Sequence, residues 1–226
     1  MEKNRDLKLV LVTVLAVGIV GLSIGFAAFS NVLRINSSAN VSPDEHSFNV
    51  DFSSSESAVE EKEIVATMSS TALTDYQPAV PMSATNAKIN NDTDPTISNL
   101  SATFNAPGQK AVYNFYAYNK GELDAYLKSI VYANVSGQTS NKVCTAGKGT
   151  TDALVQKACE GIVVKVKVGS EAETTSGLAS ITNHQLIKSA SEPVTVTIEY
   201  LANSAVADGD FTVSFGDISL NYSSVD

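Results

Sequence analysis

Few residues in this chain suit metal or histidine chemistry. The 226 residues include two His, two Cys and no Trp. Basic residues are also scarce, because 15 Lys and Arg stand against 24 Asp and Glu and leave a net charge of −9. A surface of this sign repels the phosphate backbone of nucleic acids. The composition therefore argues against a nucleic-acid partner and against a zinc or histidine-based catalytic centre.

Sequence signatures of catalysis are missing as well. The chain has no His-Glu-x-x-His segment, no Gly-x-Ser-x-Gly elbow and no phosphate-binding glycine loop. A Ser-His-Asp triad around His184 remains an alternative, but a polar surface histidine at the end of a strand is the simpler interpretation of that residue. We therefore assign no catalytic residue and no cofactor, and we expect no enzyme.

The first thirty residues differ from the rest of the chain. A short charged start precedes residues 9–29, which carry no charge, and small residues follow at Ala27, Ala28 and Ser30. This pattern is typical of a secretory signal peptide, with cleavage after Ala27 or Ser30. An uncleaved membrane anchor is the alternative, since about 20 apolar residues span a bilayer. Both interpretations place the rest of the chain outside the cytoplasm, and both limit membrane contact to the leader.

Cys144 and Cys159 are the only cysteines. Disulfides persist outside the cytoplasm, so we expect these two residues to be bridged. Between them, Thr151 and Asp152 resemble a helix N-cap, and apolar residues follow at helical spacing until Gly161. A short helix is therefore predicted inside the disulfide loop.

Beyond residue 30, apolar residues recur with a period of two, which indicates strands with one solvated face. Residues 53–82 are instead rich in Ser, Thr and Glu and predict a long surface loop, with a possible strand at 63–67. In the last strand the apolar parity changes at Gly216 and Asp217, as a β-bulge would produce. The predicted strands are residues 48–52, 97–104, 111–118, 126–135, 162–168, 194–200 and 211–222.

These strands predict an all-β fold, an antiparallel, jelly-roll-like β-sandwich with one short helix and an N-terminal signal helix. We divide the chain into a leader (1–30), an N-terminal β-arm (31–45) and a sandwich domain (46–226).

Two acidic clusters are candidates for calcium, one at Asp92 and Asp94 and one at Asp208 and Asp210 with Asp217 nearby. Asp-Gly is also common turn chemistry, so we assign no metal site. A group of aromatic residues is either a stacking platform for carbohydrate or, as we expect, part of the sheet core. Its members are Tyr113, Phe115, Tyr116, Tyr118, Tyr126 and Tyr132.

The arm carries the most informative pattern. Between residues 32 and 41 the apolar positions alternate with polar ones until Pro43 ends the strand, because proline cannot continue a ladder. Such a strand either pairs within its own sandwich or adds to the sheet edge of a neighbouring molecule, and head-to-tail addition propagates as a fibre. The assembly residues of this arm are Val32, Leu33, Ile35, Ala39 and Val41.

The junction at residues 22–30, followed by an Asn and a body rich in Ser and Thr, resembles the TasA/camelysin family of Gram-positive bacteria. The resemblance implies a jelly-roll subunit that a dedicated signal peptidase releases and that assembles into fibres of the extracellular biofilm matrix. Camelysin-like proteins are also described as metallopeptidases, but this chain has no recognisable zinc motif.

We therefore expect a secreted, non-enzymatic structural subunit whose partners are other copies of itself. A monomeric module that binds cell-surface glycan is the first alternative, and a secreted metallopeptidase is the second.

Overall fold

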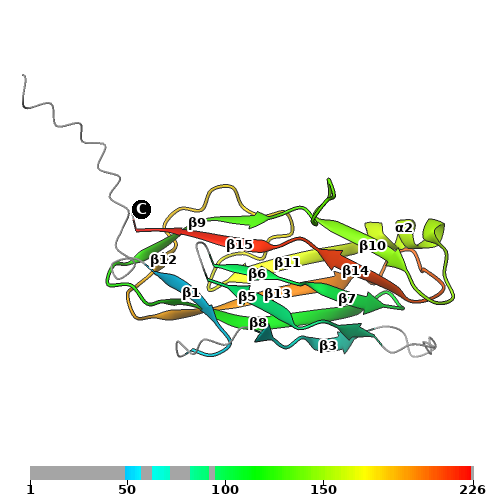
Figure 1. The fold of residues 1–226 in the computed structure, drawn as a ribbon, viewed down its shortest axis with the longest axis horizontal. Helices are drawn as coiled ribbons and strands as arrows, with labels where there is room; N and C mark the ends of the chain where they lie inside the picture. The colour runs from blue at the N-terminus through cyan, green and yellow to red at the C-terminus, as the bar shows by residue number, and fades with distance from the viewer. Residues whose placement is uncertain (1–48, 57–62, 72–81, 92–94, 225–226) are drawn as a thin grey trace, which may run out of the picture. The chain divides into compact units, whose positions relative to one another are not determined.

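The computed structural model describes residues 49–56, 63–71, 82–91 and 95–224 (Figure 1). All of them belong to the unit Pro43–Asp226. The predicted signal helix, the cleavage region and the β-arm lie outside the described residues, as do Asp92 and Asp94.

The first layer of the fold is one antiparallel sheet with the order β1-β8-β13-β11. The central strand β8 pairs with β13 along one edge, and β1 and β3 share its other edge. The strands are β1 (Val50–Ser53), β3 (Thr67–Ser70), β8 (Gln109–Asn119), β11 (Ile162–Val168) and β13 (Ser191–Tyr200).

The second layer consists of two further antiparallel sheets. Two stretches of the chain, residues 96–104 and 211–223, each contribute one strand to both sheets. Figure 1 shows β14 and β15, in red, running on from each other. One sheet contains β12 (Gln185–Leu186), β9 (Ala125–Tyr132), β15 (Ile218–Ser223), β6 (Thr96–Ser98), β5 (Ala87–Asn90) and β2 (Glu63–Ile64). The other contains β10 (Lys142–Ala146), β14 (Phe211–Phe215), β7 (Ser101–Phe104) and β4 (Ser83–Ala84).

A crease separates these two sheets and explains the parity change in the last strand. β14 ends at Phe215 and β15 begins at Ile218, and the alternate residues of both strands are buried. At the crease, an added Cβ on Gly216 would lie 2.1 Å from the carbonyl oxygen of Ala133. The predicted parity change is confirmed, although the register shift lies further on, between Asn221 and Tyr222. Glycine at the crease lets two neighbouring backbones approach closely.

Burial follows the predicted alternation closely. In β11 the residues Ile162, Val164, Val166 and Val168 are buried, and the residues between them are half-buried or exposed. The strand β8 is central, as predicted, but its two faces differ because the outward residue Asn114 is exposed. Across the described ranges, the all-β, sandwich-like fold with one short helix is confirmed.

Aromatic side chains join the layers. The ring of Tyr200, from β13, meets the ring of Phe211, from β14, edge to face with centroids 5.3 Å apart. The ring centroid of Phe104, from β7, lies 6.1 Å from that of Tyr200 and 6.4 Å from that of Phe211. All three side chains are fully buried. This cluster forms the core where the first sheet faces the sheet of β14.

The prediction of a long surface loop at residues 53–82 is partly wrong. β2 and β3 lie within it, and at the break between them the chain crosses from the second layer, which contains β2, to the first layer, which contains β3. Ile64 of β2 is buried, which ties this crossing to the core. The strand predicted at 63–67 is present in part as β2, whereas β3 was missed because it is short and consists largely of Ser and Thr.

Candidate functional site

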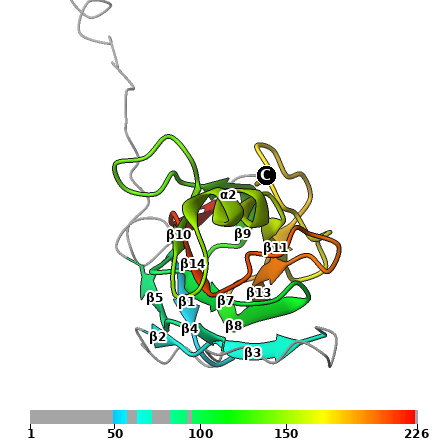
Figure 2. The same cartoon turned by 90° about the vertical axis from the view of Figure 1, so that its right-hand side faces the viewer.

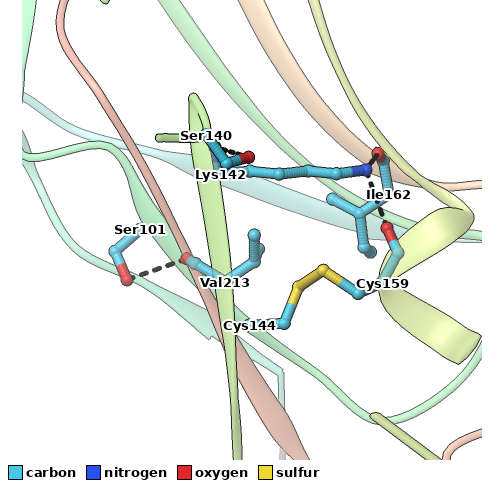
Figure 3. Close-up of a disulfide and its surroundings, with 7 residues drawn as sticks. All are labelled: Ser101, Ser140, Lys142, Cys144, Cys159, Ile162 and Val213. Atoms are coloured by element: carbon cyan, nitrogen blue, oxygen red, sulfur yellow. Dashed lines mark hydrogen bonds between the residues drawn. A yellow bond between two sulfur atoms is a disulfide. The ribbon is translucent and has the colours of Figure 1, made fainter. Parts of the chain in front are cut away.

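The predicted disulfide between Cys144 and Cys159 is present, with the two Cα atoms 6.1 Å apart (Figure 3). The predicted helix is present as well, as α2 (Asp152–Glu160), with Thr151 as N-cap residue and Gly161 as C-cap residue. The bridge joins the middle of β10 to the last turn of α2.

Lys142 adds a second link at the same place. Its Nζ donates to the carbonyl oxygens of Cys159, at 2.7 Å, and Ile162, at 2.6 Å (Figure 3). A cation at a helix C-terminus satisfies carbonyl groups that have no partner within the helix. Burial lowers the pKa of Lys142, and the nearby Glu160 opposes that shift.

α2 closes one side of the sandwich. Figure 2 shows it between β10, the edge of one layer, and β11, the edge of the other. Val155 and Ala158 of the helix are buried among the core residues. A helix packed beside the edge strand β10 hinders pairing of that edge with other chains.

The candidate calcium cluster at Asp208 and Asp210 is used as a turn. Asp208 has a φ of 57°, and Asp210 accepts the backbone N–H of Lys148 through Oδ1 at 2.7 Å. Gly147 donates its backbone N–H to the Asp210 carbonyl at 2.8 Å. In the part of the chain that the structure describes, no three His, Cys, Asp or Glu side chains are grouped to hold a metal ion.

The aromatic group is dispersed through the fold. Tyr113 and Phe115 are buried in the core, while Tyr116 and Tyr118 lie half-buried on the outer face of β8. Burial raises the pKa of Tyr113 to about 12. Tyr126 belongs to the other layer, on β9, so the group does not form one stacking platform.

A largely buried polar cluster surrounds His184, which we expected at the surface. His184 is instead 7% exposed, with Nδ1 2.8 Å from Glu171 Oε1 and Nε2 2.7 Å from Glu192 Oε2. The hydroxyl of Tyr222, from β15, donates to Glu192 Oε1 at 2.9 Å. We call these four residues the His184 cluster.

Space for this cluster depends on a glycine with a left-handed backbone. Gly169 has a φ of 48°, and an added Cβ would lie 2.4 Å from Glu192 Oε2. Any other residue would be strained here and would push against the carboxylate.

Sequence reasoning missed the cluster because its members are far apart in the chain. One signal was available, since Glu192 continues the inward parity of Val194, Val196 and Ile198 in β13. A carboxylate at an inward position needs a hydrogen-bonding partner, and His184 and Tyr222 fill that need.

Two carboxylates keep the imidazole charged. The hydrogen bond to the Glu192 carboxylate is the largest cause and raises the pKa of His184, whereas burial lowers it. The charge of Glu192 and the contact with Glu171 raise it further, and the resulting pKa is about 9. Both ring nitrogens then donate N–H groups at neutral pH, so neither has a lone pair free for a metal or for proton abstraction. The cluster is suited to holding segments together rather than to catalysis.

The cluster predicts a pH dependence of stability. The pKa of His184 rises from 6.5 to about 9 on folding, so its contribution is complete below pH 6.5 and is lost as the pH rises through about 9. The full shift corresponds to a loss of at most about 3 kcal/mol. Urea unfolding at pH 6, 7.5 and 9.5 measures this decline, and His184→Gln should flatten it. An equal decline in His184→Gln would contradict the assignment to this residue.

Comparison with known protein families, with curated proteins and with solved structures finds no match for this chain. The site is therefore interpreted from its own geometry. Among the described residues, no helix is long and apolar enough to cross a membrane. The disulfide fits a compartment outside the cytoplasm.

Proposed function

We propose that this chain is a secreted structural subunit that assembles into extracellular fibres by adding its N-terminal arm to a sheet edge of a neighbouring copy. The observation that carries the proposal is the alternating arm at residues 32–41, placed directly before a sandwich whose described strands come from residues 50–223. Its biological setting would be a matrix of the TasA/camelysin kind, after release by a signal peptidase.

The described part of the chain supports a structural role in two ways. The His184 cluster joins the two layers, since Glu192 lies on β13 and Tyr222 on β15. A disulfide and a lysine clamp also hold α2 against β10. These features stabilise a subunit and provide no reactive group with an open position.

Assembly should depend on the apolar face of the arm. In the secreted protein, the double variant Leu33→Asp/Ile35→Asp is expected to sediment as a monomer at concentrations where the wild type forms fibres. The physical reason is that two carboxylates cannot enter the apolar side of a sheet without a large desolvation cost. Analytical ultracentrifugation and electron microscopy measure the outcome.

The matched control is Asn36→Asp/Asn40→Asp, which adds the same charge to the polar face of the arm and should leave fibres intact. Thermal unfolding checks that all variants remain folded. Fibres of unchanged length in Leu33→Asp/Ile35→Asp, or a wild type that stays monomeric at every concentration, would overturn the proposal. In the second case, binding to cell-wall glycan through Tyr116 and Tyr118 becomes the function to test.

A further inference from the structure

Residues 169–190 run from the end of β11 to the start of β13, and we call them the strap. The strap leaves the first layer at Gly169, crosses to β9 in the second layer, and returns. It closes the same side of the sandwich as α2, but beside β9 instead of β10. Thus each half of this side has its own cover.

The backbone of the strap is bonded to both layers. Thr174 and Val166 of β11 exchange two hydrogen bonds of 2.9 Å, and Leu178 and Ile130 of β9 do the same. Ile181 donates its N–H to the Lys128 carbonyl at 2.8 Å. The strap therefore pairs the outer edge of β11 at Val166, and Glu171 donates its N–H to the Val168 carbonyl at 2.8 Å.

Apolar packing of the strap is thin by comparison. Ile181 and Leu186 are its buried hydrophobic residues, whereas β13 alone buries Val194, Val196 and Ile198. Gly177, Asn183 and Ser189 have φ values of 75°, 62° and 59°, so the strap is a series of turns. Segments with few apolar contacts open locally at lower free energy than the core of a domain.

The His184 cluster fastens this segment. Glu171 and His184 belong to the strap, and Glu192 and Tyr222 belong to the two layers beneath it. These are the titratable groups that face the imidazole or its carboxylate partners. Once the imidazole loses its proton, one ring nitrogen presents a lone pair to a carboxylate, and that contact becomes repulsive.

We propose that the strap is a pH-sensitive cover that opens as a local unit at alkaline pH, when the His184 cluster releases it, and that its opening uncovers the outer edge of β11. The strap bonds to β8 only at its last residue, Asn119, which contacts Leu186, Ser189 and Ala190. The rest of the sandwich stays folded, because the long pairing of β8 with β13 and the aromatic cluster of the core lie outside the strap. The outward backbone N–H and C=O groups of Val166, within this seven-residue edge strand, then lose their partners.

Amide hydrogen exchange of the full secreted protein tests the proposal. Between pH 7 and pH 10, protection factors of the amides of Thr174, Leu178 and Ile181 should fall at least tenfold, while those of Val196 and Ile198 in β13 stay constant. Protection factors already account for the faster intrinsic exchange at high pH. Equal protection of the strap and β13 at every pH would show one cooperative unit and would overturn the proposal.

A pair of conservative variants separates the fastener from general effects of charge. Glu171→Gln removes one charged partner of His184 and should lower strap protection about tenfold at pH 7. Glu173→Gln is the matched control, because Glu173 lies two residues away and is paired with Lys165 at 3.7 Å. The same loss in both variants, or a loss in neither, would contradict the role of the His184 cluster.

Discussion

Tyr200→Ala is expected to lower the free energy of unfolding by about 4 kcal/mol, as is common for truncating a large buried aromatic residue. The ring of Tyr200 lies between Phe104 and Phe211, and its hydroxyl donates to the carbonyl of Ala205. Removing the ring leaves a cavity between the two layers that the surrounding strands cannot fill. Urea unfolding followed by circular dichroism measures the loss.

Two other variants divide this effect into its parts. Tyr200→Phe keeps the ring and removes the hydrogen bond, so it should cost about 1 kcal/mol. Leu201→Ala changes the next residue, whose side chain is 38% exposed, and should stay within about 0.5 kcal/mol of the wild type. A loss in Tyr200→Ala no larger than in Leu201→Ala would mean that the layers do not pack through this cluster.

Removing the disulfide with Cys144→Ser/Cys159→Ser is expected to cost about 3 kcal/mol, the value that chain entropy gives for a loop of this length. The bridge joins two residues 15 positions apart, and the loop between them contains all of α2 except its last residue, Glu160. Without it, α2 is held by Val155, Ala158 and the Lys142 clamp. Unfolding of the oxidised, reduced and double-serine proteins under the same conditions measures the contribution.

Lys142→Met provides the comparison for that experiment. It keeps the length of the side chain and removes the two hydrogen bonds to the end of α2, so its effect should be smaller than that of the serine variant. If reduction leaves stability unchanged while Lys142→Met destabilises strongly, the clamp and not the disulfide holds the helix.

Local patterns in the sequence predicted much of the fold. Alternation in residues 162–168 predicted β11 because successive side chains of a strand point to opposite faces, and burial in β11 follows that pattern. The helix followed from Thr151 at its start and Gly161 at its end. Each of these signals lies within a few residues of the element that it specifies.

Contacts between distant residues decided what the local signals did not contain. The crease at Gly216 depends on how closely the backbone near Ala133 approaches. The cluster around His184 contains hydrogen-bonded pairs that are 8 to 30 positions apart, from the strap and from both layers. No spacing rule connects them, so the same histidine looked like a surface residue in the sequence.

The sequence by itself therefore determined where the longer strands with clear alternation and the helix form, and that the two cysteines suit a bridge. The tertiary structure decided which strands pair, how the strap crosses between the layers, and which polar residues meet beneath it. The physical reason is range, because periodicity and capping act between neighbours in the chain, whereas pairing, burial of charge and proton affinity depend on what folding brings together.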